Sequence, residues 1–165
     1  MTGAAALIET LRGRVAVGDC DYCGRMNVDA YVARISDATV TLGHAIGFTA
    51  EYIAEKRCGL VTLHQDIAYL GELEAGDLLV MHGGVLSVDG DQITLLHHML
   101  RMEDGAVVLT AMVLMRCIDL ERRTPVAFDA PILARARRLL VRKADTGARS
   151  TGPGGDQAPK RVARR

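Results

Sequence analysis

The sequence predicts a single α+β domain in which a curved antiparallel sheet of about five strands wraps one long helix. Two observations lead to this prediction. A long stretch near the N-terminus has apolar residues at helical spacing, and strand-like runs with turn residues between the later ones follow it. The chain has 165 residues, of which 49% are hydrophobic, so it can bury a core. We expect the domain to span residues 1–144.

The first elements are a short strand and the long helix. Residues 12–17 alternate in polarity and predict the strand, and residues 18–26 are typical of a loop. Apolar side chains then recur at three- and four-residue steps, at Val28, Tyr31, Val32, Ile35, Ala38, Thr39, Leu42, Ala45 and Ile46. Asn27 is a suitable N-cap, Asp29 suits the first turn, and Gly47 suits the C-terminal stop. We expect a helix of about 18 residues with this face buried.

The rest of the domain is mainly strands. Residues 49–57 predict a second short helix, and four strand-like runs follow, at residues 60–70, 77–88, 92–102 and 106–120. The turns at residues 89–91 and 103–105 contain Asp and Gly, so the last three strands should form an antiparallel meander. Gly83 and Gly84 inside a strand predict a bulge or a sharp bend.

The C-terminal part should be a helix followed by a tail. Residues 131–142 predict a helix with a basic side. Residues 145–165 are rich in Gly, Pro, Ser and Arg without apolar period, which is typical of disorder. The last twenty residues carry five basic side chains and one acidic side chain. This basic tail is either a solvated end or an arm for an anionic partner.

Charge and hydropathy exclude several classes of protein. Lys+Arg and Asp+Glu balance at 20 each, which disfavours a nucleic-acid-binding protein. The longest strongly apolar run, residues 106–115, is too short to cross a bilayer. The N-terminus has no charged region before its apolar stretch, so it does not resemble a signal peptide. We therefore expect a cytoplasmic protein without nucleic-acid or membrane partners.

The cysteines predict no metal site. Cys20 and Cys23 form a C-x-x-C pair, but a zinc site needs a second pair at similar spacing, and none exists. We expect ordinary thiols, and neither a metal nor another cofactor.

Residues 106–115 are apolar on both faces of their strand, and a second subunit would cover the face that the helix leaves open.

The loop at residues 18–27 is the candidate for chemistry. It places two carboxylates, an Arg and an Asn directly before the N-terminus of the long helix. Such a helix end has unpaired N–H groups that can stabilise an oxyanion, and a nearby carboxylate can act as nucleophile or base. Acidic residues before helices also serve as simple caps. Position alone leaves both interpretations open.

The same residues resemble a known family. The pattern D-x-D-Y-x-G-x-M-N-x-x-x-Y begins at Asp19, and Ser36-Asp37-Ala38-Thr39 follows in the helix. This stretch resembles hot-dog thioesterases of the 4-hydroxybenzoyl-CoA thioesterase type, and most of all the bacterial betainyl-CoA and carnitine-pathway thioesterases. The resemblance covers about residues 14–131. It implies a hot-dog fold, an acyl-CoA substrate, and a homodimer or homotetramer with active sites between subunits.

The resemblance also implies roles for individual residues. Asp21 matches the catalytic carboxylate, and the N–H of Val28 matches the oxyanion donor. Gly24 would allow the chain to approach the substrate closely. Asn27 is either the N-cap or a residue that orients the loop or a water. Tyr31 either packs in the core or lines the substrate pocket.

Three further residues belong to this comparison. Arg25 stands where the family usually has His, and Arg cannot exchange protons near neutral pH. Its guanidinium would contact substrate and repel a cationic acyl group, which disfavours betainyl-CoA. His64 and Asp66 are two residues apart in a strand and share a sheet face. His64 is either a general base that activates water or a structural histidine, and Asp66 is a candidate substrate-binding residue.

These observations predict an acyl-CoA thioesterase that hydrolyses a small or medium acyl-CoA to a free acid and coenzyme A. One alternative is a non-catalytic hot-dog module that binds acyl thioesters or a partner protein. A hot-dog dehydratase or hydratase is disfavoured because the chain lacks a D-x-N-P-x-H string.

Overall fold

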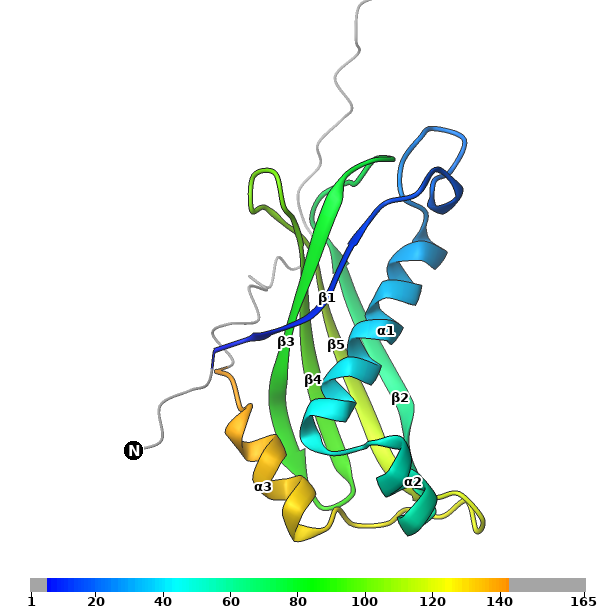
Figure 1. Ribbon diagram of the computed structural model, residues 1–165, viewed down its shortest axis with the longest axis vertical. Coiled ribbons are helices and arrows are strands. Elements are labelled where there is room, and N and C mark those ends of the chain that lie inside the picture. The colour runs from blue at the N-terminus through cyan, green and yellow to red at the C-terminus, as the bar shows by residue number, and fades with distance from the viewer. Residues whose placement is uncertain (1–5, 143–165) are drawn as a thin grey trace, which may run out of the picture.

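One curved antiparallel sheet and the long helix on its face define the structure, a computed structural model that describes residues 6–142 (Figure 1). The five strands lie in the order β1-β3-β4-β5-β2. Along the chain the elements are β1 (Ile8–Arg14), a 3-10 turn (Val17–Asp19), α1 (Val28–Ile46), α2 (Ala50–Lys56), β2 (Cys58–Tyr69), β3 (Leu78–Asp89), β4 (Gln92–Arg101), β5 (Val107–Asp119) and α3 (Ala130–Arg138). The predicted fold class is confirmed.

Helix α1 begins and ends at the predicted residues. The Asn27 side chain accepts a hydrogen bond from the N–H of Ala30 at 2.8 Å, and Gly47, with φ of 110°, ends the helix in the left-handed region. Its buried residues are Tyr31, Ile35, Ala38, Thr39, Leu42, Gly43 and Ile46. Three residues of the predicted apolar face are not buried: Val28 is 59% exposed in the first turn, Val32 is half-buried, and Ala45 is exposed in the last turn. The apolar stripe therefore runs past the core at both helix ends.

The last three strands form the predicted antiparallel meander, and β2 pairs with the outer side of β5. The prediction for Gly83 and Gly84 was a bulge or a sharp bend. The bulge lies slightly later, because the register between β3 and β4 is regular at both glycines and shifts between Val85 and Ser87. Close packing explains Gly84 instead. A Cβ added there would lie 2.6 Å from Cγ1 of Val141, so the C-terminal segment can approach β3 closely only over a glycine.

Strand β1 and helix α3 differ from their predicted bounds. The first strand ends at Arg14 and not at residue 17, because pairing with β3 defines it and the N–H of Val15 already turns to the carbonyl of Asp77, at 2.9 Å. β1 is an outer strand with exposed charged side chains and an irregular register between Glu9 and Leu11.

Helix α3 ends at Arg138, four residues before its predicted end. The segment after α3 then pairs with the edge of β3, next to the stretch that pairs with β1. The N–H of Val85 donates to the carbonyl of Leu139, and the carbonyl of Val85 accepts from the N–H of Val141, both at 2.9 Å. Hydrogen bonding to the open edge of β3 thus replaces the last helical turn. The predicted tail, residues 145–165, lies outside the described residues.

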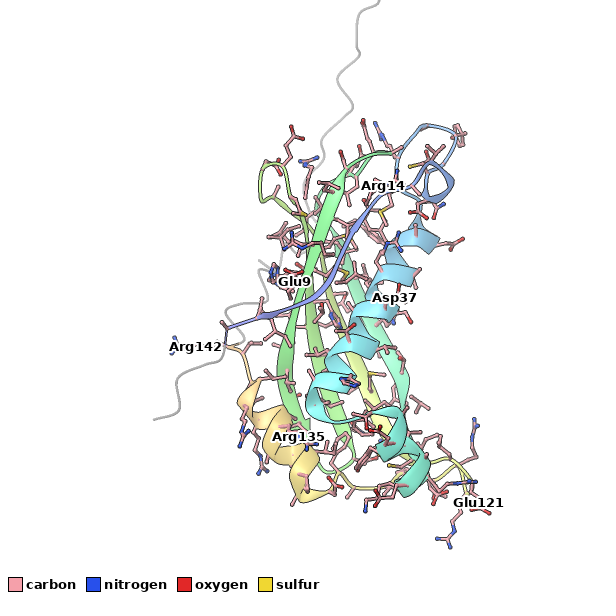
Figure 2. All side chains as sticks on the ribbon, viewed as in Figure 1. Glu9, Arg14, Asp37, Glu121, Arg135 and Arg142 are labelled. Carbon is pink, nitrogen blue, oxygen red and sulfur yellow. The ribbon has the colours of Figure 1, made fainter. Side chains whose placement is uncertain are left out.

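The core fills the space between α1 and the sheet, and it includes Ile35, Leu42, Leu95, Met99 and Val113. On the other face of the sheet, Met112 and Leu114 of β5 stay half-exposed, so α1 covers one face of the apolar strand. Within residues 6–142, no helix has the length and apolar character that a bilayer span requires. Figure 2 shows the two ends of the molecule: Arg14 lies near the loop that leads into α1, and Glu121 lies at the opposite end.

Candidate active site

The loop before α1 is a compact turn built from its own backbone. Asp21 and Arg25 face each other, with the N–H of Asp21 donating to the Arg25 carbonyl at 2.8 Å, and Cys20 and Met26 form an antiparallel bridge beside them. The N–H of Gly24 donates to the Asp21 carbonyl at 3.0 Å, and Gly24 has φ of 79°. A left-handed residue is needed to close this turn, so glycine is favoured at position 24.

The Asp21 carboxylate is fixed by this turn through one of its oxygens. Its Oδ1 accepts hydrogen bonds from the N–H groups of Cys23, at 2.8 Å, and Arg25, at 3.2 Å. These bonds orient the side chain and do not involve Oδ2. In the isolated chain Asp21 is exposed, and it lines neither of the two cavities described below. Within residues 6–142 of a single chain, Asp21 is therefore open to solvent, and the expected site between subunits needs a second copy to enclose it.

The N-terminus of α1 follows directly. Asn27 donates its N–H to the Asp19 carbonyl at 2.8 Å while its side chain caps Ala30, so its N-cap role is confirmed. Val28 is the first helical residue, and its N–H has no intrahelical acceptor at that position. The helix dipole adds partial positive charge at the same end. The exposed first turn can thus receive an anionic oxygen.

A second loop, residues 71–77, braces the first. The N–H of Met26 donates to the Leu73 carbonyl at 2.7 Å, and the N–H of Leu73 donates to the Tyr31 hydroxyl at 3.2 Å. Tyr31 is 5% exposed and packs edge-on against Tyr69, with ring centroids 5.4 Å apart. Burial raises the pKa of the Tyr31 phenol, so the hydroxyl stays neutral at physiological pH. Core packing is therefore the observed role of Tyr31.

Arg25 does not present a free charge to the loop. Its Nη1 lies 2.8 Å from Oε1 of Glu72, an ion pair in which both side chains are more than half exposed. The predicted repulsion of cationic acyl groups assumed an unpaired guanidinium, and Glu72 offsets that charge. Exposed pairs of this kind contribute about 0–1 kcal/mol to stability, so the pair matters more for local charge than for folding.

Carboxylates gather around the two loops. Desolvation raises the pKa of the Cys20 thiol, and the negative charges of Asp19, Asp21, Asp77 and Glu74 raise it further. A cysteine so placed is a poor nucleophile at neutral pH, because only the thiolate is reactive. Cys20 is therefore not a candidate nucleophile of this loop.

His64 and Asp66 lie elsewhere in the chain. The β2–β5 register puts Gln65 and Ile67 opposite the core residues Val113 and Ala111, so His64 and Asp66 point to the face of the sheet away from α1. Both are exposed on this outer strand. They share one face as predicted, but the fold does not bring them beside Asp21 in the same chain.

Two cavities flank the ends of the sheet. One, of about 370 Å³, is lined by Gly76, Asp77, Leu78, Arg101, Met102 and Glu103 and adjoins the bracing loop, because Arg101 donates to the Glu72 carbonyl at 3.3 Å. The other, of about 270 Å³, lies at the opposite end and includes Tyr52, Cys58 and Asp129. The described residues contain no group of three or more His, Cys, Asp or Glu arranged to hold a metal ion.

Sequence reasoning missed two partners of this loop. Glu72 holds Arg25 from a distance of 47 residues along the chain, and Arg34 of α1 holds Asp19 at 3.0 Å. Neither contact leaves a local pattern, because each depends on how separate segments meet in the fold. The only sequence signal was the high density of acidic residues in both loops.

The fold and the loop define a hot-dog protein of the thioesterase type, and comparison with known proteins agrees. The chain belongs to the thioesterase-like superfamily, whose sequence profile matches residues 15–136. The resemblance noted in the sequence is confirmed.

One individual relative is similar in sequence over most of this chain. An L-carnitine dehydrogenase/betainyl-CoA thioesterase of Agrobacterium fabrum is 33% identical over 119 residues, which is 72% of this chain. The chain spans 24% of that relative's length.

Solved structures share the fold at low identity. A Staphylococcus aureus protein in complex with CoA is 21% identical with a TM-score of 0.76, covering 97% of this chain and 99% of that one. A 1,4-dihydroxy-2-naphthoyl-CoA thioesterase from Synechocystis is 15% identical with a TM-score of 0.70, covering 81% and 98%.

Proposed function

We propose that the chain is an acyl-CoA thioesterase that hydrolyses a small or medium acyl-CoA to a free acid and coenzyme A. The observation that carries this proposal is the Asp21 carboxylate, held by two backbone N–H groups in a loop that runs into the N-terminus of α1. Asp21 either attacks the thioester carbonyl or takes a proton from the attacking water. Membership of the thioesterase-like superfamily supports this reaction.

The N–H of Val28 is the proposed oxyanion donor. Attack on a thioester places negative charge on the carbonyl oxygen, and a preorganised donor in a positive potential stabilises that charge. The Asn27 side chain caps Ala30, so it does not occupy the first N–H of the helix. Gly24 keeps the facing side of the loop free of a side chain, and nothing lies within 4 Å of the Cβ position there.

Assembly completes the proposed site. Asp21 is exposed in one chain, and β2 is a twelve-residue outer strand with Leu63 and Tyr69 each 46% exposed. Long outer strands with apolar side chains pair readily with another strand. We propose a homodimer through β2, with homotetramers formed from such dimers. His64 and Asp66 of β2 reach a substrate near Asp21 only if another copy supplies them.

The acyl group is open to a direct test. The Arg25–Glu72 pair leaves no net charge at the position that was expected to repel a cation. The Agrobacterium fabrum relative is named for betainyl-CoA, so a cationic acyl-CoA belongs in the panel beside neutral and anionic ones. We expect thiol release from at least one small or medium acyl-CoA, measured with a thiol reagent.

The catalytic role of Asp21 is tested by Asp21→Asn. The amide keeps an oxygen that can accept the two N–H bonds but is neither a base nor a nucleophile of comparable strength, so kcat should fall by about 10²–10⁴-fold. Glu51→Gln is the matched control, because Glu51 is an exposed carboxylate in the first turn of a different helix, α2, outside the loop. The melting temperature should stay within a few degrees for both. Full turnover by Asp21→Asn on the best substrate would remove the assignment.

A binding module is the alternative function. The observations that favour it are the exposure of Asp21 and the Arg at position 25, where the family usually has His. Calorimetric binding of coenzyme A without thiol release from any acyl-CoA would establish it.

We also propose a cytoplasmic location. All four cysteines are free thiols in the structure, including the buried neighbours Cys58 and Cys117 on β2 and β5, and free thiols are typical of a reducing compartment.

A further inference from the structure

We propose that Arg34 of α1 is a positioning residue for thioester hydrolysis, acting through Asp19 on the loop that carries Asp21; this inference rests on the proposed function. Nη2 of Arg34 lies 3.0 Å from Oδ2 of Asp19, and the two side chains are 27% and 26% exposed. The pair is much more enclosed than the Arg25–Glu72 pair on the same loop, whose side chains are 53% and 62% exposed. Enclosed pairs are less screened by water and salt.

Asp19 joins three parts of the site at once. The Oδ2 that meets Arg34 also accepts the N–H of Ala16 at 3.0 Å, which fixes the chain before the loop. Its backbone carbonyl accepts the N–H of Asn27 at 2.8 Å, which fixes the N-cap of α1. Arg34 lies about two helical turns beyond that cap. Residues 19–27 are therefore tied to α1 at both ends, at the cap and at Arg34.

This arrangement determines where Asp21 sits relative to the first turn of α1. Asp21 is two residues after Asp19, and the proposed oxyanion donor, Val28, directly follows Asn27. Reaction rates depend steeply on such geometry, and a displacement of about 1 Å can cost about 100-fold. Without Arg34, Asp19 keeps its bond to Ala16, so the loop should stay folded but lose its attachment to the side of the helix. We therefore expect a large loss in kcat with a small loss in stability.

The experiment is a double-mutant cycle in the full chain. Arg34→Met removes the guanidinium and keeps the aliphatic stem, and Asp19→Asn removes the charge and keeps an acceptor for Ala16. Each should lower kcat by about 10–100-fold while KM changes by less than about threefold. The double variant should be no worse than the poorer single variant, because both changes remove the attraction between the same two charges. Arg34→Lys should restore part of kcat.

Two controls separate positioning from folding. Arg12→Met breaks the exposed Arg12–Glu9 pair on β1, which lies outside the loop, and should leave kcat unchanged. Melting temperatures of all variants should lie within a few degrees of wild type.

The proposed positioning role of Arg34 is overturned if the wild type is active and Arg34→Met is equally active. It is overturned as well if the losses in kcat multiply in the double variant. It is also overturned if kcat falls only in step with the melting temperature. A wild-type chain that releases no thiol from any acyl-CoA overturns the proposed function as well. The two failures are therefore distinguishable.

Discussion

A buried histidine should make the protein sensitive to acid. His97 of β4 has no exposed surface, and its Nε2 lies 3.1 Å from Oγ1 of Thr39 on α1. Burial, with a smaller contribution from His98, lowers the pKa of His97 from 6.5 to about 4. In the unfolded chain the imidazole takes up a proton near its ordinary pKa, whereas the folded chain excludes that proton until about pH 4.

The sign and size of the pH effect on stability follow from the difference between the pKa of His97 in the folded chain and in the unfolded chain. Between pH 6.5 and about pH 4 the unfolded state binds more protons, so the free energy of unfolding falls as the pH falls. The slope is about 1.4 kcal/mol per pH unit, which amounts to about 3 kcal/mol over the whole window. The stability that depends on neutral His97 is fully present above pH 6.5 and is lost progressively below it.

Urea unfolding from about pH 7.5 to about pH 4 measures this directly. His97→Gln keeps an amide that can meet Thr39 but cannot titrate in this range, so its stability should lose about 3 kcal/mol less than that of wild type over the window. His44→Gln, at an exposed position of α1, serves as the control and should behave like wild type. Equal pH dependence in wild type and His97→Gln would refute the reasoning.

Four other substitutions test the packing and the loop. Gly24→Ala places a side chain at φ of 79°, so it should cost about 1–2 kcal/mol locally and lower kcat, and an unaltered kcat would show that the turn tolerates alanine. Ile35→Ala removes a side chain with no exposed surface and should cost about 2–5 kcal/mol in urea unfolding. Val40→Ala, at a position 70% exposed, should change stability by less than about 0.5 kcal/mol. Gly84→Ala puts a Cβ 2.6 Å from Val141 and should speed hydrogen exchange of the Val141 amide, with unchanged exchange as the contrary result.

Local signals explain why most elements could be predicted from the sequence. Asn27 and Gly47 mark the ends of α1 through capping and a left-handed residue, which are properties of single positions. The meander followed from its turn residues. The bounds of the first strand and the last helix were predicted wrongly because both depend on pairing with β3. One stretch of β3 pairs with residues 8–14, and the next stretch pairs with residues 139–141.

Only the part of the site that lies in one continuous segment of the chain could be predicted from the sequence. Asp21 and Asn27 stand in a continuous pattern, and the structure gives them the expected neighbourhood at the start of α1. The charge state around Arg25 was not predictable, because Glu72 approaches from a separate loop. The position of His64 away from Asp21 likewise depends on which face of β2 meets α1, and strand alternation alone cannot decide that.

The unlike borders of the sheet limit how far assembly can proceed. A two-fold axis through the proposed contact uses the β2 border of both copies, so a β1 strand forms each outside margin of the pair. The charged groups of Glu9, Arg12 and Arg14 and the irregular register of β1 oppose the addition of a further strand there. Strand pairing should therefore stop at two chains and not continue into a fibre.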